Sequence, residues 1–94
     1  MIEKDVRIAI GGVLMTREAA GIAHALMGYE ARVLLRREEM TVNGKSLMGI
    51  VSLGIRDGQT VTVIADGRDE EEAVACFRRA VQRIDPRQQG RICL

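Results

Sequence analysis

Several residue types that commonly carry chemistry are scarce in this sequence. It has one histidine, His24, no tryptophan, one tyrosine and one phenylalanine. A histidine-based metal site or a catalytic triad therefore has little material to work with, and platforms that stack nucleic-acid bases are not expected. Cys76 and Cys93 are too few for a disulfide framework and lack the spacing of a structural zinc site. No metal site and no cofactor are expected.

The sequence also has no charge excess and no long apolar run. Of its 94 residues, 14 are Lys or Arg and 13 are Asp or Glu, which gives a formal net charge of +1 at pH 7. This balance argues against direct nucleic-acid binding, which a basic surface would support. Charged residues within the first five positions exclude a signal-peptide core, and no stretch reaches membrane-spanning length. We expect a small cytoplasmic protein that does not associate with membranes.

The apolar residues that are present predict both strands and helices. Alternating patterns indicate half-buried strands, and apolar residues three or four apart indicate helices with one buried stripe. The order β-α-β-β-α-β-α predicts an α+β fold, one four-stranded sheet covered on one face by three helices. Residues 1–84 would form this domain, Pro86 would stop the last helix, and 85–94 would be a flexible C-terminal tail. The strands are expected at 2–10, 31–36, 40–42 and 59–66, and the helices at 16–27, 46–54 and 69–84.

Short polar residues mark where the helices are expected to begin. Thr16 and Ser46 each precede an apolar helical pattern and can accept a backbone N–H through the side-chain hydroxyl. Asp69 is followed three residues later by Glu72, which resembles a capping box with Asp in the cap position. We therefore expect these side chains to satisfy the first N–H groups of the three helices.

The region that begins with the second of these caps also carries a family resemblance. Residues 41–55 read Thr-Val-Asn-Gly-Lys-Ser-Leu-Met-Gly-Ile-Val-Ser-Leu-Gly-Ile, and this segment closely resembles the regulatory-serine region of HPr. HPr is the histidine-containing phosphocarrier of the bacterial sugar phosphotransferase system. The resemblance continues without gaps from about residue 4 to 84. It implies the open-faced β-sandwich of HPr, with an antiparallel sheet, which agrees with the element order above.

The resemblance fails at the phosphoryl acceptor. HPr proteins carry Gly-(Leu/Ile)-His-Ala-Arg-Pro at the start of the first helix, and this histidine accepts a phosphoryl group from the general phosphotransferase enzyme. Counted back from Ser46 without gaps, the acceptor position holds Met15, whose thioether has no titratable nitrogen. Arg17 is kept, whereas the proline of the motif is replaced by Glu18, whose carboxylate would repel a phosphate. Both changes indicate that this chain does not carry phosphate on a histidine at that position.

This sequence lacks the acceptor histidine and keeps the serine region, and in this combination it resembles the Crh-type paralogues of Gram-positive bacteria. That resemblance implies phosphorylation of Ser46 by the ATP-dependent HPr kinase/phosphorylase. It also implies that the phosphorylated form binds a catabolite-control transcription factor. A phosphate beside a helix N-terminus is stabilised locally, so it would change the surface and leave the domain folded. The predicted partner contacts are Arg17, Lys45, Leu47, Met48 and Val51.

Two other functions remain open from the sequence. His24, the single imidazole, lies about 13 Å along the first predicted helix from position 15 and would be the acceptor of an unconventional phosphocarrier. The simpler explanation is an exposed surface histidine without a role. Alternatively, the chain is a structural or oligomerisation module that is not phosphorylated, as a monomer or a weak, strand-swapped dimer with a hinge at Gly11-Gly12. The preferred hypothesis is a regulatory binding protein, not an enzyme.

Overall fold

The computed structural model describes residues 1–83, and the element order within them is the predicted one. Ile84, Pro86, Cys93 and the predicted tail at 85–94 lie outside the described residues. The strands are β1 (Ile2–Arg7), β2 (Arg32–Arg37), β3 (Met40–Asn43) and β4 (Thr60–Asp66), and the helices are α1 (Thr16–Leu26), α2 (Leu47–Leu53) and α3 (Glu70–Val81).

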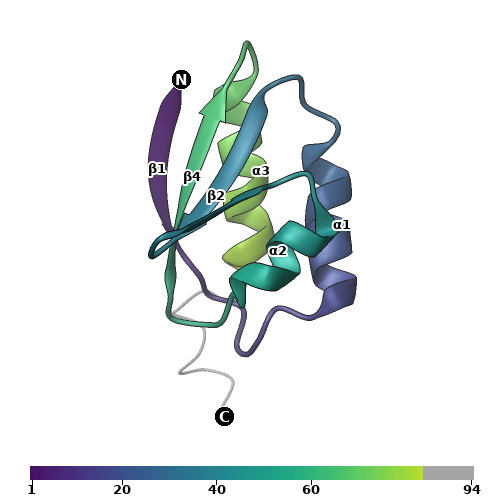
Figure 1. Ribbon diagram of the computed structural model, residues 1–94, viewed down its shortest axis with the longest axis vertical. Coiled ribbons are helices and arrows are strands. Elements are labelled where there is room, and N and C mark those ends of the chain that lie inside the picture. Colours follow the sequence, from purple (N-terminus) through teal and green to yellow (C-terminus); the bar gives the residue numbers. More distant parts are fainter. Residues whose placement is uncertain (84–94) are drawn as a thin grey trace.

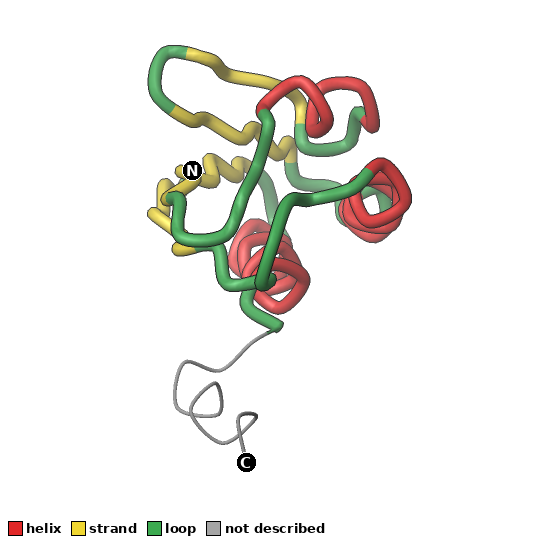
Figure 2. The backbone as a smooth tube through the Cα atoms, turned by 90° about the horizontal axis from the view of Figure 1, so that it is seen from below, coloured by secondary structure: helices red, strands yellow, loops and turns green. Residues whose placement is uncertain are grey.

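The strands form one antiparallel sheet in the order β1-β4-β2-β3. β4 is central and pairs with both of its neighbours, with Val61 opposite Val6 of β1 and Ala65 opposite Val33 of β2. Figure 1 shows α1, α2 and α3 lying over one face of this sheet, and the turned view in Figure 2 separates the strands from the helices. The predicted α+β architecture, with all three helices on one face, is confirmed.

The core lies between the sheet and the helix layer. Val61, Val63 and Ala65 of β4 are fully buried, whereas the alternate residues of this strand are exposed or half-buried. Phe77 of α3 is the largest fully buried side chain. Burying an aliphatic or aromatic side chain of this size stabilises a fold by about 1.5–3 kcal/mol, so the sheet and helices hold each other in place. The buried stripes of α1 and α3 are Ala19, Ile22, Ala23 and Leu26, and Ala73, Val74, Phe77 and Val81.

The first strand ends earlier than the alternating pattern predicts, at Arg7 and not at residue 10. Beyond it Ile8 still makes backbone hydrogen bonds to the turn before β4, and the Ala9 N–H donates to the carbonyl of Val81 at the end of α3 (2.7 Å). Ile8 is nevertheless buried, and Ile10 packs against the core. The alternation therefore reflected burial on one side of the chain, which continues after the pairing with β4 has ended.

Ser46 caps α2 as predicted, but the other two expected caps are wrong. The Ser46 hydroxyl accepts the Gly49 N–H (3.1 Å). The N-cap of α1 is Met15, so Thr16 is already the first residue of the helix. Asp69 occupies the cap position of α3 but makes no side-chain bond to that helix.

The Asp69 carboxylate instead binds the loop that follows α1. Its two oxygens accept the N–H groups of Glu30 (2.9 Å) and Ala31 (2.8 Å), and the Glu30 N–H contributes most to holding the pKa of Asp69 below its ordinary value. Glu70 accepts a backbone N–H from the preceding turn (3.1 Å). No side-chain hydrogen bond among residues 1–83 joins Glu72 to Asp69, so the expected capping box does not form. Asp69 thus joins the start of α3 to the loop between α1 and β2.

Candidate functional site

The α1 and α2 helices pack with opposite directions, which places the two predicted sites at opposite ends of one helix pair (Figure 1). The start of α1 lies beside the C-terminal end of α2, where the Leu14 N–H donates to the carbonyl of Ile55 just after that helix (2.9 Å). Just before α2, the Lys45 ammonium donates to the Tyr29 carbonyl beyond the end of α1 (2.7 Å). Because α2 has 7 residues, the predicted acceptor position and the predicted serine are separated by about 10 Å along its axis.

Met15, the residue predicted at the acceptor position, lies at the start of α1. Its backbone is extended (φ −83°, ψ 164°) as expected of an N-cap, and its side chain is 64% exposed. Residues 15–18 line an open hollow of about 540 Å³ at this helix start. The position is accessible to a partner, but a thioether offers no nitrogen that a phosphoryl group could occupy.

Glu18 occupies the helix start that an external anion would otherwise use. Its Oε1 accepts the Met15 N–H (3.1 Å), and its Oε2 pairs with Arg83, just beyond the end of α3. The Met15 N–H contributes most, with Arg83 second, to holding the pKa of Glu18 below its ordinary value. The carboxylate is therefore ionised at neutral pH and satisfies the positive end of the helix dipole.

The two partners of Glu18 were missed from the sequence. Sequence reasoning predicted repulsion between this carboxylate and a phosphate, but not that the carboxylate is engaged within the domain. The spacing of three residues between Met15 and Glu18 is the N-cap to N3 spacing of a capping box, so the first partner had a local signal. Arg83 lies far away in the sequence, and only the packing of α1 against α3 brings it close.

Arg17 is the other predicted contact at this end. It is exposed, and none of the ion pairs among residues 1–83 involves it. Its guanidinium is therefore accessible for a carboxylate or phosphate on a partner.

Ser46 and Lys45 lie at the start of α2, and both are held by the domain. The half-buried Ser46 has an extended backbone (φ −106°, ψ 118°), with its hydroxyl on the Gly49 N–H. The half-buried Lys45 donates its backbone N–H to the Asn43 side chain (2.8 Å) as well as its ammonium to Tyr29. Lys45 thus connects the start of α2 to the segment after α1. The sequence predicted Lys45 as a partner contact and did not predict this structural role.

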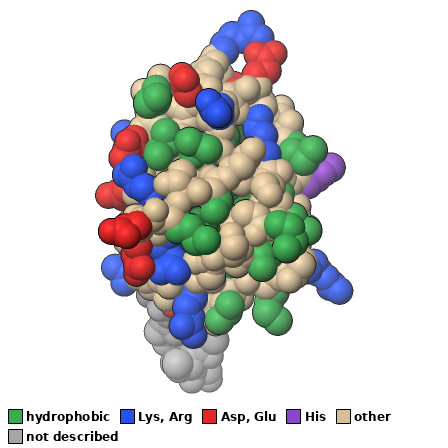
Figure 3. Space-filling model, viewed as in Figure 1, with side chains coloured by type: hydrophobic (Ala, Val, Ile, Leu, Met, Phe, Trp, Pro, Cys, Tyr) green, Lys and Arg blue, Asp and Glu red, His purple; other side chains and the backbone are tan. Residues whose placement is uncertain are grey.

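The three predicted apolar contacts on α2 differ in exposure. Met48 is 73% exposed and Val51 is 39% exposed, whereas Leu47 is half-buried and packs against the core. Figure 3 shows hydrophobic side chains gathered over α2 and the neighbouring loops, with Lys and Arg side chains around them. Met48 and Val51, together with the exposed Val13 and Met15 near the start of α1, are called the apolar surface below.

His24 lies exposed in the last turn of α1. It is not at the helix start, where N–H groups could hold a phosphate. In the described part of the chain, no group of three His, Cys, Asp or Glu residues is arranged to hold a metal ion. No helix within residues 1–83 has the length and apolar character needed to cross a membrane.

Comparisons with known proteins connect this geometry to one family. A family model described as "PTS HPr component phosphorylation site" matches residues 2–83. The HPr-like protein Crh of Halalkalibacterium halodurans is 35% identical over 74 residues, which cover 79% of this chain and 88% of that protein.

Solved structures agree in both fold and sequence. The phosphocarrier protein HPr of Bacillus anthracis superposes with a TM-score of 0.81 at 33% identity, over 86% of this chain and 96% of the other. Crh of Bacillus subtilis, solved as a dimer with a swapped domain, gives a TM-score of 0.71 at 33% identity, over 90% and 98% of the two chains.

Proposed function

This chain belongs to the HPr family, and from that membership we propose that it is a Crh-like regulatory protein, switched by phosphorylation of Ser46. It is not a histidine phosphocarrier and not an enzyme, and it acts in the cytoplasm through protein–protein binding. One observation carries the proposal. The position that the resemblance assigns to the acceptor holds an exposed thioether, Met15, whereas Ser46 caps α2.

The start of α1 supports the loss of phosphotransfer beyond the missing imidazole. An incoming phosphate would approach the N–H that the Glu18 carboxylate already accepts. Two anions a few ångströms apart repel each other, and the ion pair with Arg83 opposes movement of the carboxylate out of the way. A histidine at position 15 would therefore meet a helix start that is already neutralised.

The start of α2 supports the serine switch. The Ser46 oxygen already accepts the Gly49 N–H, and a phosphate there adds a charge of about −1.5 to −2 beside a helix start that favours anions. The added charge would lie on the same helix as the exposed Met48 and Val51. A partner with an apolar groove and basic side chains would read the phosphate and the apolar surface together.

The family suggests which proteins fill these roles. HPr kinase/phosphorylase would add and remove the phosphate, and a catabolite-control transcription factor would bind the phosphorylated form. Arg17, exposed near the apolar surface, would contact the partner, whereas Lys45 would mainly hold the start of α2 in place.

The backbone after β1 supports a monomer that can open into a swapped dimer. Gly11 has a left-handed backbone (φ 74°), and Gly12 follows it as the second residue of the predicted hinge. The N–H groups of Ile10 and Gly11 donate to the Asp57 carboxylate (2.9 and 3.0 Å). These bonds favour the closed monomer, because exchange of β1 between two chains requires the hinge to straighten.

Intact-mass measurement tests the proposed function. The protein is incubated with ATP and HPr kinase, and separately with phosphoenolpyruvate and the general phosphotransferase enzyme. We expect one phosphate from ATP, absent in Ser46→Ala and retained in Ser52→Ala. Ser52 is a matched control because it lies exposed on the same helix and its hydroxyl donates to the Gly49 carbonyl (2.8 Å). Phosphate from phosphoenolpyruvate that disappears in His24→Ala would establish the phosphocarrier alternative. No phosphate from either donor would contradict the serine switch and leave the structural module.

A further inference from the structure

A second surface hollow lies where the turn before β4 meets the C-terminal end of α2, at the other end of this helix from Ser46. Its volume is about 410 Å³. The hollow is lined by Val13, Arg37, Gly54, Arg56 and Gln59. Two of these five described residues carry guanidinium groups and none is acidic. Together they are called the arginine hollow below.

Arg37, the last residue of β2, is held in place by the end of α2. Its Nε donates to the Leu53 carbonyl (2.8 Å), where the helix dipole favours a cation. Its Nη1 lies 3.4 Å from the exposed Glu38 carboxylate, which is a long hydrogen bond. None of the hydrogen bonds found among residues 1–83 uses Nη2, which lies beside Gly54. The fold therefore positions this guanidinium and leaves it donors for another acceptor.

Arg56 and Gln59 belong to one turn and are joined through its backbone. The Arg56 N–H donates to the Gln59 Oε1 (2.9 Å). With its oxygen used in this way, the Gln59 side chain offers its NH₂ group as a donor. The exposed Arg56 guanidinium forms none of the ion pairs found among residues 1–83. The turn thus adds a second guanidinium and an amide donor to the arginine hollow.

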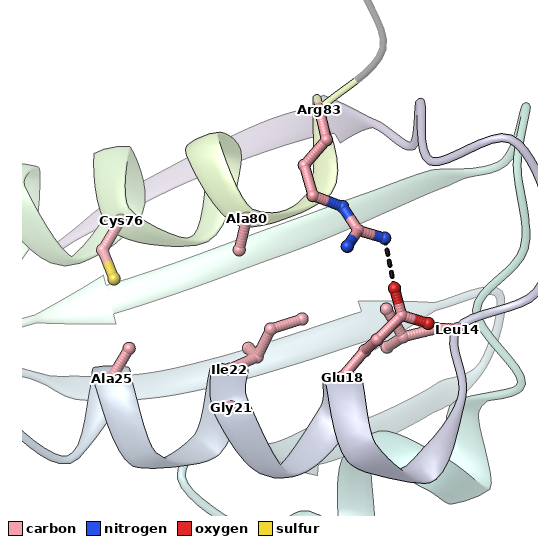
Figure 4. A pocket seen from close by; sticks show the side chains of 8 residues that line it. All are labelled: Leu14, Glu18, Gly21, Ile22, Ala25, Cys76, Ala80 and Arg83. Atoms are coloured by element: carbon pink, nitrogen blue, oxygen red, sulfur yellow. Dashed lines mark hydrogen bonds and ion pairs between the residues drawn. The ribbon is translucent and has the colours of Figure 1, made fainter.

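The start of α1 shows the contrasting case, an arginine that already has its anion. In Figure 4 the Arg83 guanidinium meets the Glu18 carboxylate across the space between α1 and α3. Near the arginine hollow, the Asp57 carboxylate is instead engaged by two backbone N–H groups of the loop after β1 (2.9 and 3.0 Å). The positive charge of the hollow is therefore offset only in part, by the long contact with Glu38.

The charge and the donors of the arginine hollow favour a dianionic phosphate group. A phosphate monoester has three terminal oxygens and a charge of about −1.5 to −2, which two guanidiniums and an amide can engage from different sides. A carboxylate has two oxygens and a single charge, so it would use fewer of these donors. The side chain of Val13, 51% exposed, offers an apolar wall for a small organic part of the ligand.

The shape of the arginine hollow favours a small molecule. Sites for small ligands are concave, with volumes of about 300–1,000 Å³, and the hollow falls within this range. They combine apolar lining with a few positioned polar groups, as Val13 and the three donor side chains do here. A phosphate group alone would leave part of this volume for the rest of the ligand.

We propose that the arginine hollow binds the phosphate group of a small phosphate monoester, with Arg37 and Arg56 on its oxygens and Gln59 as a further donor. The ligand is a free small molecule, and not a phosphate carried by another protein. Because Val13 also belongs to the apolar surface, the bound ligand would add negative charge at the edge of that surface. Binding does not involve Ser46, so its failure would leave the proposed switch untouched.

NMR titration of the isotope-labelled full chain tests binding. The probes are inorganic phosphate and glycerol phosphate, with sodium chloride added to keep the ionic strength constant. We expect saturable shifts of the Arg37 Nε–H, the Gly54 amide and the Gln59 side-chain amide. The dissociation constant should be on the order of 1 mM, because the charges are partly solvated. Sodium acetate, a carboxylate, should bind at least about tenfold more weakly. Shifts without saturation, or equal affinity for acetate, would overturn the proposal.

Matched arginine variants test which side chains hold the phosphate. Arg37→Gln/Arg56→Gln should weaken the binding of glycerol phosphate at least about tenfold. Arg32→Gln/Arg68→Gln removes the same charge from two exposed arginines outside the hollow and should stay within about twofold of the parent. Arg32 begins β2 and lies about 17 Å from Arg37 along the strand. Equal losses in the two double variants would overturn the site, because the attraction would then follow from net charge alone.

Further single variants separate lost binding from lost folding. Arg56→Gln changes an exposed side chain that makes no hydrogen bond among residues 1–83, so it should weaken binding about threefold with an unchanged melting temperature. Glu38→Gln removes the carboxylate that competes for Arg37 and should strengthen binding about threefold, whereas Glu39→Gln, in the same turn, should stay closer to the parent. Unchanged affinity in Arg56→Gln, or equal gains from the two glutamate variants, would contradict a site built on both arginines.

A peptide probe distinguishes the two sources of a phosphate monoester. A short peptide with one phosphoserine presents the same group on a protein backbone, and it should bind no more tightly than glycerol phosphate. Binding at least about tenfold tighter than glycerol phosphate, and lost in Arg37→Gln/Arg56→Gln, would assign the arginine hollow to a partner protein. That result would overturn the proposal of a free small molecule.

Discussion

The starts of α1 and α2 meet the same physical requirement with different side chains. Each helix exposes N–H groups at its N-terminus that need an acceptor. At α1 the acceptor is the Glu18 carboxylate, which is charged and paired with Arg83. At α2 it is the neutral Ser46 hydroxyl. The start of α1 therefore carries a permanent negative charge, whereas the start of α2 carries a neutral hydroxyl to which a phosphate can be added.

The two caps give a physical reason for the proposed difference between the two sites. A side chain that delivers a permanent negative charge to a helix start satisfies the dipole but opposes a transferable phosphate. A hydroxyl cap stabilises the helix in the unmodified protein and leaves room for a phosphate. Under the proposed function, the domain keeps the regulatory serine and has lost the acceptor, whose predicted position lies about 10 Å away along α2.

Restoring the acceptor should produce the largest effect on this comparison. The double variant Met15→His/Glu18→Ala should accept phosphate from phosphoenolpyruvate and the general enzyme, and Met15→His alone should react at least about tenfold more slowly, because the carboxylate repels the phosphate. The rate of acid-labile phosphate incorporation measures both. Met15→His/Glu71→Ala is the control, since Glu71 is an exposed first-turn residue of α3. Equal rates for Met15→His and the first double variant would show that Glu18 has no part in the loss.

Removing the hydroxyl cap should have a smaller effect, on stability. Ser46→Ala should lower the free energy of unfolding by about 1 kcal/mol, because the Gly49 N–H loses its acceptor. Ser46→Asp should remain within about 0.5 kcal/mol of the parent, since a carboxylate also caps a helix. Urea unfolding measures both, with Ser52→Ala as the control. A strongly destabilised Ser46→Asp would indicate that α2 does not tolerate an anion at its start.

The pH dependence of Glu18 gives a finer test. The pKa of Glu18 is lowered by the Met15 N–H and by Arg83, so its stabilisation is present at pH values above the ordinary glutamate pKa of about 4.3. It is lost as the pH falls through the lower pKa of the folded state. Glu18→Gln should therefore be less stable than the parent at pH 7, and the two should converge in acid.

Urea unfolding between pH 7 and pH 3 follows this convergence. Glu71→Gln serves as the matched control, because Glu71 makes none of the side-chain hydrogen bonds found among residues 1–83, and it should track the parent throughout. A difference between Glu18→Gln and the parent that stays constant with pH would show that the bonds to Glu18 do not depend on its charge.

Local sequence signals predicted most of the fold and one of the two helix starts. The alternation of Val61, Val63 and Ala65 located β4, because a half-buried strand imposes that period. Ser46 was recognised as a cap because its acceptor function needs only the next three residues. Leu47 and Met48 could not be separated by pattern alone, since both lie at the start of a short apolar helix and only packing decides which is buried.

The features that the sequence did not predict depend on contacts between distant segments. Asp69 has the local appearance of a cap, but the loop at residues 30–31 competes for its carboxylate and binds it. Glu18 meets Arg83 only because α1 and α3 pack side by side. The first strand ends at Arg7 because the backbone of Ala9 finds a partner at the end of α3. None of these partners is fixed by spacing along the chain.

The most direct test of the central claim is to locate the phosphate. The parent chain is incubated with each phosphate donor and its enzyme side by side, and the products are mapped by tandem mass spectrometry under conditions that preserve both phosphoserine and phosphohistidine. The account predicts phosphate on Ser46 with ATP and HPr kinase, and none on the segment that contains Met15 and His24 with phosphoenolpyruvate. Phosphate on His24, or phosphate from ATP on a residue other than Ser46, would contradict it.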